Sequence, residues 1–172
     1  MKLMNHRSYV LRTLIRLLVI TAIVAAVALV WAQAPAKPAG AEAEDVLPPG
    51  SPALIQPQEL VEAMKTGHEQ PVVLYTGPKA FWVQAHVPGA DYIGPVAKPE
   101  GIQTLRARIA SLPKTKSVVI YCGCCPWSHC PNIRPAFAEL KKEGFTKVRV
   151  LYLPTSFGVD WKEKGLPVAS GE

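Results

Sequence analysis

The first 32 residues of this 172-residue chain contain no aspartate or glutamate, although they carry Lys2, Arg7, Arg12 and Arg16. The formal net charge of +6 therefore arises mostly at the N-terminus, since the remaining residues hold 15 basic against 13 acidic side chains. Domains that bind nucleic acids need a clear excess of basic residues to neutralise phosphates. The part of the chain expected to fold lacks this excess, so we expect no nucleic-acid partner.

The apolar run at residues 17–31 (LLVITAIVAAVALVW) is short for a membrane-spanning helix. As a helix it would span roughly 22 Å, less than the roughly 30 Å of bilayer hydrocarbon. A basic segment, a short apolar run and small residues are typical of a secretory signal, so residues 1–32 are predicted to be a signal peptide cleaved before Gln33. The alternative is an uncleaved membrane anchor that tethers the domain through residues 17–31. Both the signal peptide and the anchor predict a periplasmic or otherwise extracytoplasmic domain, because the positively charged N-terminal segment stays on the cytoplasmic side of the membrane.

Residues 33–53 lack apolar periodicity and are rich in proline, alanine, glycine and acids, which is typical of a disordered tether. A single globular domain is predicted over residues 54–170. Strands are expected at 72–75, 118–121 and 148–153, and helices at 58–65, 102–112 and 133–143. Strands separated by helices of this length indicate βαβ units, and therefore a parallel sheet with helices on both faces.

All four cysteines lie within residues 118–137 (VVIYCGCCPWSHCPNIRPAF). In open parallel sheets, functional sites form where strands end and loops lead into helix N-termini. Cys122 directly follows an apolar strand, and backbone N–H groups in such a loop favour a thiolate or persulfide anion. We therefore predict that Cys122 is a nucleophile, with an inert buried thiol as the alternative. A rival assignment places the reactive thiolate at Cys130, which lies nearer the next helix.

Four features of the sequence resemble the rhodanese family in their order and spacing. Residues 85–93 (AHVPGADYI) are similar to its His-aliphatic-Pro-Gly-Ala signature, with Trp82 four residues before His86. The run VVIYC resembles the active-site strand, and residues 140–145 (LKKEGF) resemble the end of the helix that follows. Residues 161–168 (WKEKGLPV) resemble the closing part of the domain. The resemblance implies an α/β, rhodanese-like fold with about five parallel strands flanked by helices on both faces.

The resemblance also implies that Cys122 carries sulfur as a persulfide, from a donor such as thiosulfate to a thiol or cyanide acceptor, without a cofactor. The other candidate residues of the active-site loop are Gly123, Cys124, Cys125, Trp127, His129, Cys130, Asn132 and Arg134. Arg134 is either a binding group for an anionic donor or a solvated helix residue, and Asn132 is predicted to cap the helix. His86 is expected to be structural and Trp161 to lie in the core.

Two departures from the family leave alternatives open. Residues 75–78 (YTGP) stand where rhodaneses usually have an aspartate and an arginine, and the cysteine loop is longer than usual. A phosphatase-like enzyme on this fold is disfavoured, because its phosphate cradle closes on an arginine only a few residues after the cysteine. Arg134 lies twelve residues after Cys122.

The extra cysteines admit a disulfide within Cys124, Cys125 and Cys130, a soft-metal site, or free thiols. We favour the disulfide and assign no metal ligands, because the adjacent Cys124 and Cys125 fit poorly on one tetrahedral ion. A non-catalytic module with a disulfide-locked loop, acting in redox chemistry or soft-metal binding, is the alternative function.

Overall fold

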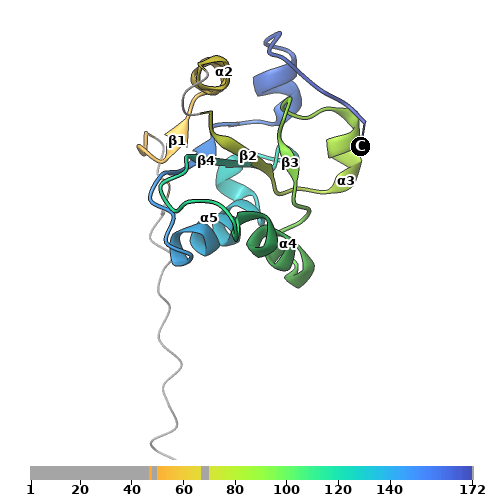
Figure 1. The fold of residues 1–172 in the computed structure, drawn as a ribbon. Coiled ribbons are helices and arrows are strands. Elements are labelled where there is room, and N and C mark those ends of the chain that lie inside the picture. Colours follow the sequence, from red (N-terminus) through yellow and green to blue (C-terminus); the bar gives the residue numbers. More distant parts are fainter. Residues whose placement is uncertain (1–46, 48–49, 67–69, 172) are drawn as a thin grey trace, which may run out of the picture. The chain divides into compact units, whose positions relative to one another are not determined.

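The computed structural model describes residues 47, 50–66 and 70–171, which contain a five-stranded sheet (Figure 1). Its strands are β1 (Leu54–Ile55), β2 (Val72–Tyr75), β3 (Asp91–Tyr92), β4 (Val118–Tyr121) and β5 (Val148–Leu151). All neighbouring strands are parallel, in the order β1-β5-β4-β2-β3. The predicted α/β fold with a parallel sheet is confirmed, and β4 is its central strand.

Helices cover both faces of this sheet. They are α2 (Pro57–Lys65), α3 (Lys79–Gln84), α4 (Pro99–Ile109) and α5 (Ile133–Lys142), with a 3₁₀ turn η1 (Trp127–His129) and a π-helical turn η2 (Gly158–Lys162). Figure 1 shows α4 and α5 on one face, with α2, α3 and η2 on the other. Among the described helices, none is both long and apolar enough to cross a membrane.

The central strand β4 supplies side chains to two separate cores. Val119 and Tyr121 pack with the core on the side of α2, α3 and η2. Ile120 and Cys122 pack with the core on the side of α4 and α5. This division follows from the alternation of side chains along a strand. Cys122 therefore faces the start of α5, which sets the surroundings of its sulfur atom.

The observed helices and strands differ from the predicted ones mainly at their ends. The helix expected at 102–112 begins earlier, at Pro99, and ends at Ile109. Proline suits a first helical position because its ring already has a helical φ and its missing N–H would have no partner there. The strand expected at 148–153 ends at Leu151, because only the residues up to that point pair with β1 and β4.

The predicted signal or anchor at residues 1–32 lies outside the described residues, as does most of the predicted tether at 33–53. Within that tether the structure describes residue 47 and residues 50–53. Leu47 is buried and belongs to the core on the side of α4 and α5. The packed domain therefore extends back to Leu47.

The YTGP segment makes a buried polar contact through Thr76. The backbone N–H of Thr76 donates to the carbonyl of Tyr121 at 2.8 Å, and its hydroxyl donates to the same oxygen at 3.1 Å. Thr76 is fully buried. These two hydrogen bonds hold the ends of β2 and β4 together, beside Cys122.

His86 and Trp161 have the structural roles expected of them. The ring of His86 stacks on Trp82 with centroids 3.6 Å apart, and its Nδ1 lies 2.9 Å from the Trp82 carbonyl oxygen. Its backbone pairs with Ala169 near the C-terminus. Trp161 is fully buried in the core beneath η2.

Candidate active site

The chain turns sharply immediately after Cys122. Gly123 has a φ of +83°, a conformation that residues with a side chain rarely adopt. A Cβ atom at this position would also lie 2.8 Å from the Cβ of Phe157. The Gly123 carbonyl accepts a hydrogen bond of 3.0 Å from the Phe157 backbone N–H. This turn fixes the sulfur of Cys122 at the carboxyl edge of the sheet, against the loop that follows β5.

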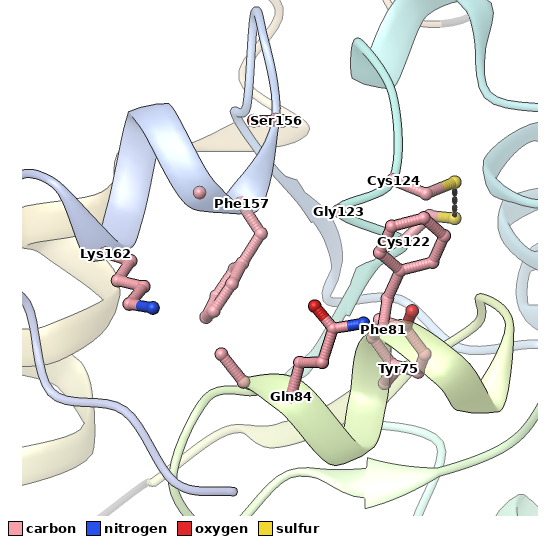
Figure 2. Close-up of a pocket in the computed structure, with 11 residues that line it drawn as sticks. Tyr75, Phe81, Gln84, Cys122, Gly123, Cys124, Ser156, Phe157 and Lys162 are labelled. Carbon is pink, nitrogen blue, oxygen red and sulfur yellow. Dashed lines mark hydrogen bonds between the residues drawn. The ribbon is translucent and has the colours of Figure 1, made fainter.

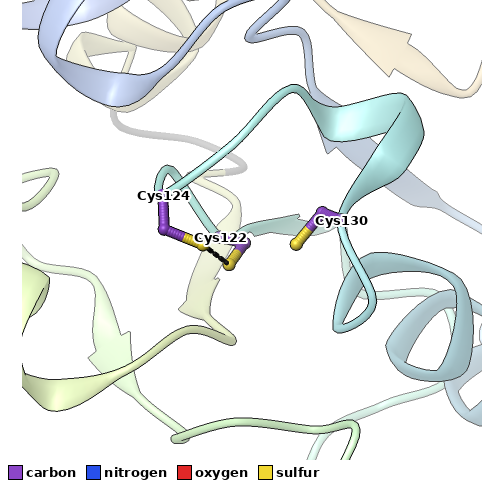
Figure 3. Close-up of side chains that lie close together, drawn as sticks. All are labelled: Cys122, Cys124 and Cys130. Atoms are coloured by element: carbon purple, nitrogen blue, oxygen red, sulfur yellow. Dashed lines mark hydrogen bonds between the residues drawn. The ribbon is translucent and has the colours of Figure 1, made fainter.

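Three of the four cysteines meet at this edge, as Figure 3 shows. The Sγ atoms of Cys122, Cys124 and Cys130 all lie within 4.8 Å of one another, and those of Cys122 and Cys124 are 3.2 Å apart. Cys125 lies outside this group, with its Sγ 3.6 Å from that of Cys124. All four cysteines, each of which the structure describes, are free thiols. The disulfide favoured from the sequence is therefore absent.

Cys130 belongs to this group because its backbone is fixed between η1 and α5. Its N–H donates to the Trp127 carbonyl at 3.3 Å, and its own carbonyl accepts the N–H of Ile133 at 3.3 Å. Both Cys130 and Cys122 are buried. In Figure 3 the side chain of Cys130 points toward Cys122. The loop thus folds back over the end of β4 and does not extend into solvent.

Asn132 occupies the N-cap position of α5 but makes no side-chain capping hydrogen bond, so its predicted role is wrong. Its Nδ2 group instead donates to the Sγ of Cys122 at 3.5 Å. Its Oδ1 accepts the backbone N–H of Ala97 at 2.9 Å. The amide therefore connects the loop before α4 to the sulfur of Cys122. Because this contact joins segments far apart in the chain, the local pattern gave no sign of it.

The sulfur of this site whose negative charge is favoured is that of Cys130. A hydrogen bond from the Cys122 thiol and backbone N–H groups of Asn132 and Ile133 lower the pKa of Cys130 to about 6, although burial opposes the shift. The same interaction with Cys130, together with burial, raises the pKa of Cys122 far above its ordinary value. Burial also raises the pKa of Cys125 to about 12. This distribution differs from the sequence-based expectation, which placed the anion on Cys122.

A pocket of about 380 Å³ opens beside the cysteines (Figure 2). Its lining residues are Tyr75, Phe81, Gln84, Ala85, Cys122, Gly123, Cys124, Ser156, Phe157, Gly158 and Lys162. The lining includes the ammonium group of Lys162 and no carboxylate. In Figure 2 Lys162 and the two cysteines lie on opposite sides of the pocket. A small anion in this pocket would therefore meet favourable charge as well as the sulfur of Cys122.

Six residues predicted for the active-site loop do not line this pocket: Cys125, Trp127, His129, Cys130, Asn132 and Arg134. Trp127 is buried, and its backbone N–H donates to the Leu153 carbonyl at 3.1 Å, so it anchors the loop to the end of β5. His129 is exposed beside Ser128, and Arg134 is exposed on α5. The sequence analysis missed Lys162 of η2, although the segment after β5 had to begin at the same edge of a parallel sheet as the loop after β4.

Comparisons with solved structures identify the fold. Over 67% of this chain and 82% of the other, the chain matches the Alr3790 protein of Anabaena sp., which has a rhodanese-like domain, with a TM-score of 0.51 and 18% identity. The chain has a rhodanese-like fold. Its match to the BH2092 protein of Bacillus halodurans has a TM-score of 0.52 and 22% identity, over 67% of this chain and 75% of the other. The family-based expectation of the fold is thereby confirmed.

A further match to this fold is the thiosulfate sulfurtransferase of Pseudomonas aeruginosa, with a TM-score of 0.51 and 18% identity. The match covers 69% of this chain but only 20% of that enzyme. No protein-family model and no curated protein matches the sequence. At these identities the comparisons establish the fold, so the chemistry has to be argued from the site.

Proposed function

We propose that this rhodanese-like domain is a sulfurtransferase that carries sulfane sulfur as a persulfide on Cys122. The observation that supports it most is the position of Cys122 between the pocket containing Lys162 and the Cys130 thiolate. This arrangement supplies a nucleophile, a proton acceptor and a cation for an anionic donor. The matching fold of a thiosulfate sulfurtransferase also supports the proposal.

In the first half-reaction Cys130 acts as the base. The Cys122 thiol passes its proton to the Cys130 thiolate along their hydrogen bond. The Cys122 thiolate then attacks the outer sulfur of thiosulfate. The sulfur–sulfur bond of thiosulfate breaks, sulfite leaves with the bonding electrons, and the transferred sulfur remains on Cys122 as a persulfide.

The second half-reaction returns the cysteines to their starting states. A thiolate or cyanide acceptor attacks the outer sulfur of the persulfide, and Cys122 leaves as a thiolate that regains its proton from Cys130. Between the two steps, the backbone N–H of Cys124 and the side-chain amide of Asn132 are placed to stabilise the negative charge. The chemistry needs no organic cofactor.

Mass spectrometry of the reduced protein after exposure to thiosulfate tests this proposal. We expect the wild-type chain to gain the mass of one sulfur atom and Cys122→Ser to gain none, because a serine hydroxyl does not form a persulfide. Cys125→Ser is the matched control, since Cys125 lies in the same loop but does not line the pocket. It should load sulfur like the wild type.

The position of the added sulfur decides between Cys122 and its rival. Peptide mapping should place it on Cys122. Sulfur found on Cys130, or loading that persists in Cys122→Ser, would show that the assignment is wrong. Absence of loading with thiosulfate and with a persulfide donor would show that the domain is not a sulfurtransferase of this kind.

A further inference from the structure

The convergence of three cysteine sulfurs is not explained by the proposed sulfur transfer, which uses Cys122 as the carrier and Cys130 as the base and assigns no role to the sulfur of Cys124. Cys122, Cys124 and Cys130 come from the end of β4, the following loop and the segment before α5, yet their Sγ atoms lie within 4.8 Å of one another. We propose that these three sulfurs form a binding site for a single Cu(I) ion.

The distances between the sulfur atoms fit three ligands around one ion. With metal–sulfur bonds of about 2.3 Å, as in zinc–thiolate sites, three sulfurs in a plane around an ion lie about 4.0 Å apart. The observed separations extend from 3.2 Å for Cys122 and Cys124 up to the limit of 4.8 Å for the group. Small side-chain rotations are enough to bring all three onto one ion.

The number and type of ligands favour Cu(I) over zinc. Thiolates are soft ligands that select Cu(I), whereas a structural zinc ion almost always takes four ligands. The nearest further donor, the sulfur of Cys125, lies outside the group of three. His129 is exposed, and its Nδ1 is hydrogen-bonded to the Ser128 hydroxyl at 3.0 Å. The described residues therefore bring three sulfurs within 4.8 Å of one another, while the sulfur of Cys125 contacts those of Cys124 and Cys130 without joining the group.

The surroundings of the sulfurs suit an anionic copper–thiolate centre. Three thiolates and one Cu(I) carry a net charge of −2, which needs hydrogen-bond donors in a buried site. The Asn132 amide donates to the sulfur of Cys122, and the backbone N–H groups of Asn132 and Ile133 point at Cys130. Such outer contacts orient the ligands of metal sites. Copper binding releases the protons of those ligands that are still thiols.

The ion has a route to this site. Cys122 and Cys124 line the pocket, and Cys124 is only half-buried, while Cys130 is buried behind them. A copper carrier can therefore deliver the ion first to the half-buried sulfur of Cys124, and the buried sulfurs of Cys122 and Cys130 then complete the site. Because Cys122 serves both activities, copper and persulfide exclude each other.

Titration of the reduced full-length chain with Cu(I), in competition with a chromogenic Cu(I) chelator and without any sulfur donor, tests the site. We expect one equivalent to bind, with three sulfur ligands by X-ray absorption spectroscopy. Cys122→Ser, Cys124→Ser and Cys130→Ser should each weaken binding by more than the roughly 10- to 100-fold typical of outer-shell substitutions. Cys125→Ser, the matched control from the same loop, should bind like the wild type.

Several results would overturn the proposal. One is that the chelator removes all copper from the wild type. Another is that Cys125→Ser weakens copper binding as much as the three ligand variants do. A third is that Co(II) or zinc binds with four ligands and more tightly than Cu(I). Near-ultraviolet circular dichroism identifies a variant that has lost its fold, and the corresponding alanine variant then replaces it. Bound Cu(I) should also block sulfur loading from thiosulfate. Since copper binding is measured without a donor, failure of the sulfurtransferase proposal leaves this test intact.

Discussion

In the proposed reaction, the sulfur of Cys122 is the nucleophile and the sulfur of Cys130 is the proton acceptor. Cys122 lines the pocket and has a raised pKa, whereas Cys130 lies outside the pocket lining and has a pKa lowered to about 6. The division arises first because the Cys122 thiol donates to Cys130, and second because backbone N–H groups at the start of α5 point at Cys130. Charge at this site therefore depends on the pairing of the two sulfurs as well as on the helix start.

The lowered pKa of Cys130 predicts a pH dependence of thiolate absorbance that can be tested. Its pKa is lowered to about 6, so the thiolate is present above that pH and becomes protonated as the pH falls through it. Thiolate absorbance in the ultraviolet should show this titration in the wild type and lose it in Cys130→Ser. Cys122→Ala removes the largest stabilising contribution and should move the midpoint up toward ordinary cysteine values. Cys124→Ser should leave it in place, and a titration that persists without Cys130 would contradict the assignment.

Lys162 is expected to act on substrate binding. It is exposed on the far side of the pocket from the cysteines, so its charge attracts an anionic donor without touching the reacting sulfur. Lys162→Ala should raise KM for thiosulfate about fivefold with little change in kcat, corresponding to roughly 1 kcal/mol for a solvent-exposed ion pair. Steady-state kinetics measure this difference, which should shrink at high salt.

Two control variants accompany Lys162→Ala. Lys162→Arg keeps the positive charge and should keep the wild-type KM. Lys164→Ala removes an exposed lysine of the same segment that does not line the pocket, and it should also leave the KM for thiosulfate unchanged. Equal effects at positions 162 and 164 would show that net charge, and not the pocket, determines KM.

At the level of elements, η2 holds one wall of the pocket in place. Trp161 stacks on Phe157 with centroids 5.6 Å apart, and its Nε1 donates to the Pro167 carbonyl at 2.7 Å. The Asp160 carboxylate accepts the backbone N–H groups of Thr155 and Ser156 at 2.6 and 2.8 Å. These contacts fix the loop after β5 and place Phe157 against the turn at Gly123.

Substitution of Trp161 should therefore affect stability strongly. Trp161→Ala is expected to lower the free energy of unfolding by about 3–5 kcal/mol, the range for removing a large buried aromatic side chain. Chemical denaturation measures the change. Val159→Ala, on the same turn but 38% exposed, should cost no more than about 0.5 kcal/mol. A loss below 1 kcal/mol for Trp161→Ala would contradict its place in the core.

At the scale of the whole molecule, we propose that the chain is exported and acts outside the cytoplasm, from the pattern of residues 1–32 alone. A C-terminally tagged full-length chain should be recovered in the extracytoplasmic fraction, with its N-terminus near Gln33 if it is cleaved. A chain that lacks residues 1–32 should stay in the cytosol. Cell fractionation and N-terminal sequencing measure this, and intact full-length chain in the cytosol would contradict it.

The sequence by itself determined the parts of the fold that depend on local pattern. The strands 72–75 and 118–121 have the predicted bounds, because their apolar runs are packed on both faces of the sheet. The sequence also placed Cys122 correctly at the end of a strand, because the apolar run 118–121 stops directly before it. The two-residue strands β1 and β3 were missed, since such short runs carry no periodicity and are defined only by their pairing partners.

Only the tertiary structure decided which groups surround Cys122. Asn132 looks like a helix cap in the sequence, but its amide bonds Cys122 and the backbone of Ala97, which lies 35 residues away. Lys162 lines the pocket from η2, and Cys130 turns its sulfur toward Cys122 at the end of β4. A local pattern fixes which residues form a strand or a helix, because the hydrogen bonds and the alternation are local. Which distant side chains meet at the edge of the sheet depends on how the loops pack, and this determines where the thiolate, the cation and the third sulfur lie.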